Sequence, residues 1–245
     1  MTSLNTYYAN SEPGYHLDVN EDGVIADSSI GLFGVIDAYG GSGIGDVVSE
    51  LVKKTLVESF GILSADEDAT LPLYFNPNYS IETNALINSL KLAHSTVKEI
   101  NQNKDTSSRG AASFLGCSLG DKRIQLVGTG NCLALLVQGE RVSLCFTPHS
   151  SGELVITGSG PLSNYPYSGV GLFDELEFFV KEVEVFQGDK LVLLSSGTYA
   201  PFNLTELAII LKERAHDARA IHEGISNFAN KRGAKGNQSI VCLEF

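Results

Sequence analysis

The sequence has few cysteines and no long hydrophobic run. Its four cysteines are isolated within apolar stretches and form no C-x-x-C pair, which favours reduced core residues over disulfides or zinc ligands: Cys117, Cys132, Cys145 and Cys242. No apolar run reaches the roughly 18 residues of a membrane helix. The first residues lack the basic-then-apolar pattern of a secretory signal. These absences predict a cytoplasmic protein without a membrane span.

Basic residues are also scarce. The chain has 17 Lys and Arg against 29 Asp and Glu, a formal net charge of -12. This balance argues against nucleic acid or an anionic membrane surface as a partner, and it fits cationic or neutral partners or a site that binds cations. Hydrophobic residues make up 43% of the chain, enough for a core, and 245 residues fit one large domain or two small ones.

The rest of the chain is organised around residues 31–46. A short apolar run, Leu32–Ile36, predicts a buried strand that ends at Asp37. A glycine-rich turn follows, and apolar residues then recur at helical spacing over residues 42–60. Asp46 stands where a dinucleotide-binding turn needs Gly and a P-loop needs Lys, which argues against both. Asp37 is therefore either a metal ligand or a carboxylate that only caps the turn.

A second acidic pair precedes the central strand. Glu21 and Asp22 stand before a short apolar strand, which a turn connects to the strand ending at Asp37, so the segment predicts a hairpin. Paired strands lie about 5 Å apart, and the hairpin would bring the three carboxylates together. Three close carboxylates cannot all ionise cheaply without a cation between them, which is a first indication of a metal. The alternative is that Glu21 and Asp22 are solvated hairpin residues.

The remaining patterns separate helices from strands. Helices are expected over residues 42–60 and 80–101, and again in a pair that starts at Asn203 and ends at Arg232–Gly233, with Ile221, Ile225 and Phe228 on one face. Strands are expected at 24–25, 32–36, 111–119, 124–127, 132–137, 142–146, 178–186, 191–194 and 239–244, with an irregular connection over 152–171. Helices in separate blocks predict an α+β fold: a four-layer αββα sandwich of two antiparallel sheets flanked by helix pairs.

Several motifs in chain order resemble one known family. They are Asn20-Glu21-Asp22, the stretch 31–41, Gly110-Ala111-Ala112, residues 127–132, Thr147-Pro148-His149-Ser150, residues 188–197 and residues 235–239. Together they resemble the metal-dependent protein serine/threonine phosphatases (PPM, or protein phosphatase type 2C), as a degenerate bacterial-type member. The resemblance covers nearly the whole chain and implies a single PPM-type domain over residues 1–245.

The resemblance implies a centre in which carboxylates hold two Mg²⁺ or Mn²⁺ ions and a bridging water attacks phosphorus. Asp37 would be the bridging carboxylate, the Ala38 carbonyl would be a further ligand, and Glu21 and Asp22 would bind metal or orient bound water. Hard divalent cations need such oxygen ligands.

Other positions depart from the family pattern. Ser196 replaces the Asp of a Ser-Asp-Gly motif, and Gly236, followed by Asn237, replaces the Asp of an Asp-Asn motif. Asn131 replaces the Asp that serves a third metal in bacterial members, and Leu17 stands where those members carry an Arg that grips the substrate phosphate. Glycines that serve backbone geometry are retained. The pattern therefore indicates a fold kept without its two-metal chemistry.

The sequence thus predicts a pseudophosphatase, a binding or regulatory component of signalling with a protein partner and no intact catalytic residues. It would hold no metal or one weakly bound Mg²⁺, Mn²⁺ or Ca²⁺. The binding groove would lie above Asp37, with Tyr39, Gly40 and Gly41 at its lip. Two alternatives stay open: an active Mn²⁺- or Mg²⁺-dependent phosphatase with altered ligands, in which Asn131, Ser196 and Asn237 offer neutral oxygens, and a single structural cation site. The oligomeric state is left open.

Overall fold

The structure is a computed structural model that describes residues 4–65, 70–119, 124–150, 165–214 and 217–245. Its strands form two antiparallel five-stranded sheets. The first sheet runs in the order β2 (Gly23–Asp27), β3 (Leu32–Gly40), β4 (Gly110–Ser118), β5 (Ile124–Thr129) and β8 (Phe179–Val183). The second runs β1 (Thr6–Glu12), β10 (Gln238–Glu244), β9 (Lys190–Leu194), β6 (Leu133–Gln138) and β7 (Arg141–Phe146).

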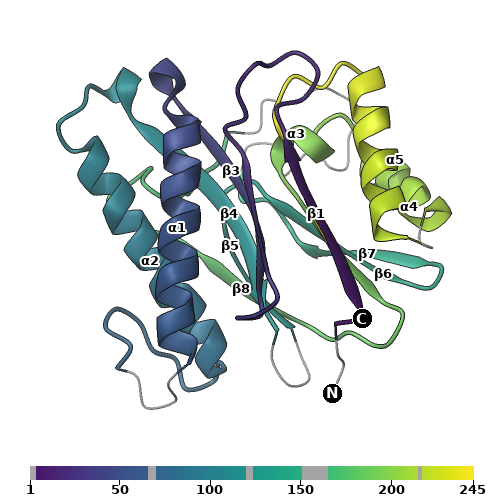
Figure 1. Cartoon of the computed structure of the whole chain (residues 1–245), viewed down its shortest axis with the longest axis horizontal. Coiled ribbons are helices and arrows are strands. Elements are labelled where there is room, and N and C mark those ends of the chain that lie inside the picture. The colour runs from purple at the N-terminus through teal and green to yellow at the C-terminus, as the bar shows by residue number, and fades with distance from the viewer. Residues whose placement is uncertain (1–3, 66–69, 120–123, 151–164, 215–216) are drawn as a thin grey trace.

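Helix pairs cover the two outer faces of these sheets. The long helices α1 (Gly45–Ser64) and α2 (Ile81–Asn101) pack on the first sheet, and α4 (Leu204–Glu213) and α5 (Ala218–Lys231) pack on the second (Figure 1). Short helical turns, η1 (Gly41–Gly43), η2 (Thr106–Ser108) and α3 (Ser196–Tyr199), follow strand or helix ends. One apolar cluster lies under each helix pair and a third lies between the sheets. The expected α+β fold with two antiparallel sheets is confirmed.

The alternation of β3 decides where its polar residues point. Leu32 and Ile36 belong to the cluster under α1 and α2, whereas Phe33 and Val35 belong to the cluster between the sheets. Because successive side chains of a strand face opposite ways, Asp37 continues the face directed between the sheets. The same face is apolar over most of the sandwich and becomes polar at the end where β3 stops. That polar end is the candidate site.

Some elements differ from the sequence prediction. Strand β1 was not expected, because Thr6–Glu12 is polar; it pairs along its whole length with β10. Helix α1 begins and ends a few residues later than expected. Phe228 of α5 is 42% exposed and does not continue the buried face of Ile221 and Ile225. Most of the irregular connection expected over 152–171 lies outside the described residues. The four cysteines are free, as expected.

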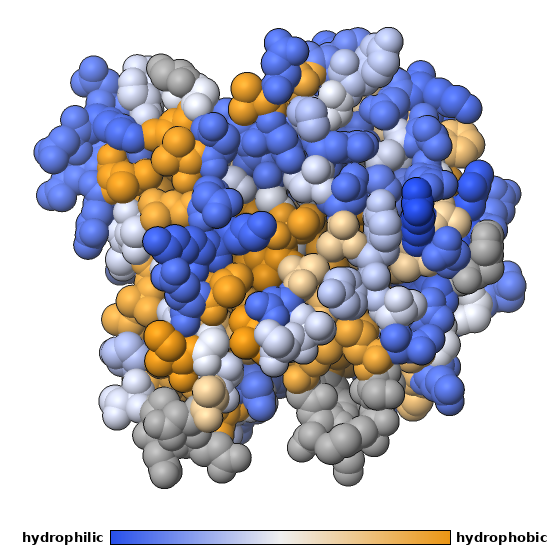
Figure 2. Space-filling model, viewed as in Figure 1, coloured by the Kyte–Doolittle hydropathy of each residue, from blue (hydrophilic) through white to orange (hydrophobic). Residues whose placement is uncertain are grey.

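The surface of this view is mixed. Figure 2 shows hydrophilic residues along the upper rim, and hydrophobic residues that reach the surface around α1 and between α1 and β1. None of the described helices combines the length and hydrophobicity that a bilayer crossing requires.

Candidate acid site at the polar end of the sandwich

Two buried carboxyl groups form the centre of the site. Asp37 lies near the end of β3 and Asp22 immediately precedes β2, so the hairpin between these strands brings them together as the sequence predicted. Each residue is only 8% exposed. Burial and then the Asp37 charge raise the pKa of Asp22, so the two carboxyls interact electrostatically. We call Asp22 and Asp37 the acid pair.

Asp37 is held by the start of α3. The backbone N–H of Ser196 donates a hydrogen bond of 2.7 Å to Asp37 Oδ2. Burial raises the pKa of Asp37, and the hydrogen bonds from the hydroxyl and backbone of Ser196 oppose this rise. Burial prevails because a carboxylate that loses its hydration is destabilised more than a few donors can restore. Ser196, which stands where the family resemblance implies a metal-binding Asp, therefore contacts the acid pair as a hydrogen-bond donor.

Asp22 is less well satisfied. Its Oδ2 is buried and has no hydrogen-bond partner among the described residues. Burial and the charges of Asp37 and Glu21 raise its pKa well above the usual 3.8, while the hydroxyls of Ser195 and Ser239 lower it. A buried carboxylate oxygen without a donor is unfavourable, so this side chain favours a bound proton or a bound cation.

Glu21 is near the acid pair but is oriented differently. Its carboxyl group lies against the start of α1, where a Cβ added to Gly45 would come within 2.6 Å of the Glu21 carboxyl carbon. Within the described ranges, no three His, Cys, Asp or Glu side chains form a group that could hold a metal ion. Glu21 therefore lies near Asp22 without forming such a group with the acid pair. The metal role assigned to them and to Ala38 stays a prediction.

The substituted positions contribute no further carboxylate. Gly236 has no side chain, and its backbone packs so closely that an added Cβ would lie 3.0 Å from Gly197 Cα. The Asn237 side chain accepts from the Glu21 N–H at 3.1 Å and donates to the carbonyls of Pro13 and Val19 at 3.1 and 2.9 Å. It thereby ties the segment before β2 to β10.

Asn131 is buried just before β6, at 3% exposure, and Ser113 Oγ accepts its N–H at 3.1 Å. Its carbonyl accepts from the Tyr199 hydroxyl. Asp22 and Asp37 are therefore the buried carboxyls that could hold a divalent cation at this end of the sandwich, beside neutral groups at the other positions.

The expected lip of the groove is arranged differently. Tyr39 is only partly exposed, and its hydroxyl is buried with no hydrogen-bond partner in the described part of the chain. Burial and the Asp37 charge raise its pKa. Gly41 donates its N–H to the Arg109 carbonyl at 3.3 Å and packs against Ser107, whose carbonyl oxygen leaves no space for a Cβ. The Tyr39 hydroxyl is therefore directed inward, and Gly40 and Gly41 serve close backbone packing.

Leu17 lies on the exposed loop that precedes Asp22 in the chain. It is 40% exposed, next to Tyr15 at 79% and Val19 at 53%. An apolar side chain at this place provides no group that could bind phosphate.

Sequence reasoning missed several residues of the polar end. Ser195, Ser239 and Cys132 all continue the inward faces of their strands, as Asp37 does on β3. Burial and the charges of the acid pair raise the pKa of Cys132, so its thiol stays protonated. Strand alternation was the signal that could have found these residues once the register of both sheets was known.

Comparison with known proteins identifies the fold. No protein-family model and no curated protein matches the sequence. Solved structures do match over nearly the full chain. PppA of Pseudomonas aeruginosa, described as a key regulatory component of T6SS, is 23% identical with a TM-score of 0.80, covering 100% of this chain and 99% of PppA.

Two mycobacterial enzymes are also similar. The PPM Ser-Thr phosphatase MsPP of Mycobacterium smegmatis is 18% identical, with a TM-score of 0.79 and 99% coverage of both chains. The serine/threonine phosphatase PstP of Mycobacterium tuberculosis is 18% identical, with a TM-score of 0.78 and 98% coverage of both. The chain has the PPM phosphatase fold. At these identities the likeness establishes the PPM fold alone, and what the PPM fold does in this chain has to be argued from its own residues.

Proposed function

We propose that this PPM-fold chain is a pseudophosphatase, which acts by binding a protein partner as a regulatory component of cytoplasmic signalling. The observation that carries the proposal is the donor set around Asp37. At the positions where the family resemblance places two more carboxylate ligands, this chain has Ser196 and Gly236. Two-metal hydrolysis needs a clamp of anionic ligands that activates water and stabilises the leaving oxygen.

The contacts of the acid pair support this proposal. The Ser196 N–H occupies Asp37 Oδ2 at 2.7 Å, and the Asn237 amide oxygen accepts from the Glu21 N–H at 3.1 Å. Both interactions stabilise the frame around the acid pair with the chain's own groups. The polar end of the sandwich can therefore be maintained as structure, while the exposed loop around Leu17 and the surfaces beside it are free to contact a partner.

A single bound cation is a second candidate, favoured by Asp22. Its Oδ2 is buried without a donor among the described residues, beside a second buried carboxyl. One Mg²⁺, Mn²⁺ or Ca²⁺ between Asp22 and Asp37 would relieve their repulsion. Such an ion would stabilise the fold without providing the two-metal clamp.

A regulatory role has support from one relative. PppA is described as a key regulatory component of T6SS, and its structure matches this chain from end to end. We extend only the general class to this chain: a regulator that works through another protein.

The proposal is tested by hydrolysis of p-nitrophenyl phosphate in excess Mn²⁺ or Mg²⁺. The wild-type protein should be no faster than Asp37→Asn, since the carboxylate would have no two-metal centre to bridge. A Mn²⁺-dependent rate that disappears in Asp37→Asn would instead establish the active-enzyme alternative. Asp18→Asn, an exposed acid on the neighbouring loop, is the matched control for lost charge.

A further inference from the structure

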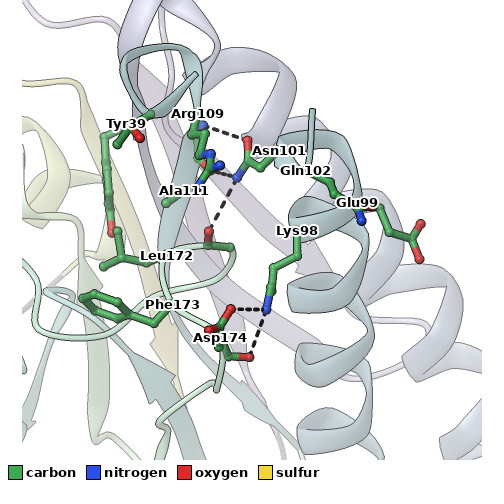
Figure 3. A pocket seen from close by; sticks show the side chains of 13 residues that line it. Tyr39, Lys98, Glu99, Asn101, Gln102, Arg109, Ala111, Leu172, Phe173 and Asp174 are labelled. Carbon is green, nitrogen blue, oxygen red and sulfur yellow. Dashed lines mark hydrogen bonds and ion pairs between the residues drawn. The ribbon is translucent and has the colours of Figure 1, made fainter. Parts of the chain in front are cut away.

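A concave site lies at the carboxyl end of α2. It is a pocket of about 750 Å³ bounded by the end of β3, the start of β4, the last turn of α2 and residues 171–174. Figure 3 shows Tyr39 on one side, Arg109 above, Lys98 opposite, and Leu172 and Phe173 below. We call this the α2 pocket. Its volume is in the range of sites that bind small organic ligands or a few side chains.

The walls of the α2 pocket are held by buried polar contacts. Asn101, only 4% exposed, donates to the Gly110 carbonyl at 2.7 Å and accepts the Gly110 N–H at 3.1 Å. His94 accepts the Gly171 N–H at 3.1 Å. Gly171 has φ +79° and packs so closely on Val97 that no side chain would fit. The backbone between β4 and residues 171–174 is therefore fixed before any ligand arrives.

The backbone of this wall is also part of a sheet. Ala112 and Val170 exchange two hydrogen bonds, of 3.0 and 2.7 Å, beyond the end of β5. The segment that carries Leu172 and Phe173 thus starts from a ladder position on β4. A preformed pocket loses less ordering free energy on binding than a mobile one.

Of the two cationic side chains that line the α2 pocket, Lys98 has a carboxylate partner and Arg109 has none among the described residues. Lys98 is neutralised by Asp174, with Nζ 2.9 Å from Oδ1. Arg109 uses its Nε to donate to the Lys104 carbonyl at 3.1 Å, and it has no carboxylate within ion-pair distance among the described residues. Glu99 belongs to the rim, but Figure 3 shows its carboxyl group pointing away from the pocket. The arginine is left as the cation available to a ligand.

The opposite wall is apolar. Phe173 is 54% exposed at the pocket, next to Leu172, and the Tyr39 ring lines the far side. A guanidinium group presents a planar fork of donors that matches a carboxylate in a bidentate fashion. Aromatic surface left exposed near such a group favours a ligand with an apolar body.

We propose that the α2 pocket binds a carboxylate joined to an aromatic or aliphatic group, with the carboxylate on Arg109 and the apolar group against Phe173. A small organic acid and the end of a peptide chain share this chemistry. The pocket is separate from the acid pair, so this inference holds whether or not Asp22 and Asp37 bind a metal.

The test is an NMR titration of the ¹⁵N-labelled full chain with three probes. N-acetylphenylalanine and acetyl-Ala-Ala-Phe carry the carboxylate, and N-acetylphenylalaninamide is the neutral match. The two acids should shift amide signals of the last turn of α2 and of residues 171–174, and the amide should bind at least about tenfold more weakly. Tighter binding of the tripeptide than of the single residue would assign the pocket to a peptide, and the reverse order to a small acid.

Variants separate the charge from the apolar wall. Arg109→Gln should weaken binding of the two acids about tenfold and leave the affinity for the amide unchanged. Arg141→Gln, an exposed arginine at the start of β7, is the matched control and should change nothing. Phe173→Ser changes a largely exposed position, so it should weaken binding of all three probes without affecting folding. The inference is overturned if neither acid shifts these signals, if acid and amide bind equally, or if Arg109→Gln binds the acids as well as Arg141→Gln does.

Discussion

Neutralising one member of the acid pair should stabilise the protein. Asp22→Asn keeps the shape of the side chain and removes a carboxylate whose Oδ2 is buried without a donor in the described part of the chain. Leaving a buried polar group unsatisfied costs about 1–3 kcal/mol, and more when it is charged. The free energy of unfolding at pH 8 should therefore rise by about 1–3 kcal/mol. For a chain of this length that raises the melting temperature by about 2–4 °C per kcal/mol.

The effect has a definite pH dependence. Burial raises the folded-state pKa of Asp22 and of Asp37 above their usual 3.8, and the Asp37 charge raises that of Asp22 further. A folded state that binds protons more tightly is favoured at low pH, so this contribution to stability is fully present below about pH 3.8 and is lost as pH rises through the folded pKa. The gain from Asp22→Asn should therefore be near zero at about pH 4 and largest at pH 8.

The assay is thermal and urea unfolding across this pH range, with Asp18→Asn as the control for an exposed acid. Added Mg²⁺ should stabilise the wild-type protein more than Asp22→Asn if one cation binds the pair, because ligand binding to the folded state raises its stability by mass action. The reasoning is refuted if Asp22→Asn is destabilising at pH 8, or if its effect is the same at every pH.

Two further predictions concern the frame around the site. His222 is buried beneath β1 and accepts a hydrogen bond from Asn10 Nδ2 at 3.0 Å, and burial lowers its pKa. Its contribution to stability should therefore be lost as pH falls below about 6.5. Urea unfolding of His222→Gln should lack that loss, and a pH profile identical to that of the wild type would disprove the prediction. Ser196→Asp with Gly236→Asp should raise Mn²⁺ affinity in calorimetry, because it adds two anionic ligands. Gly236 does not have positive φ, and a Cβ there, 3.0 Å from Gly197 Cα, requires a small shift of that neighbour. A folded double variant that binds Mn²⁺ no better than wild type would show that these positions are misassigned.

The parts of the fold that the sequence predicted are those with strong local periodicity. The apolar stripe of α2 and the run before Asp37 identify their elements without tertiary information, because each buries one continuous face. Strand β1 has no such signal. Thr6–Glu12 is an edge strand of mostly polar residues, and what makes it a strand is pairing with β10, more than 200 residues away.

In the candidate site, too, the local arrangement could be predicted and the contacts between distant segments could not. Hairpin logic correctly placed Asp22 beside Asp37, since strand register is a local property. The orientation of Glu21 was not predictable, because it depends on Asn237 and on the start of α1. Tyr39 was expected at an exposed lip, but β3 continues to Gly40 and carries its side chain inward. Such differences arise from contacts between segments distant in sequence, which pattern reasoning does not contain.

The most direct test of the central claim is a calorimetric titration of the wild-type protein with Mn²⁺, which counts the ions held at the polar end of the sandwich. With Asp22 and Asp37 as the two buried carboxyls that the described residues bring together there, the account predicts no binding or one weakly bound equivalent that is lost in Asp37→Asn. Two bound equivalents per chain, both abolished by Asp37→Asn, would contradict it and restore a two-metal centre.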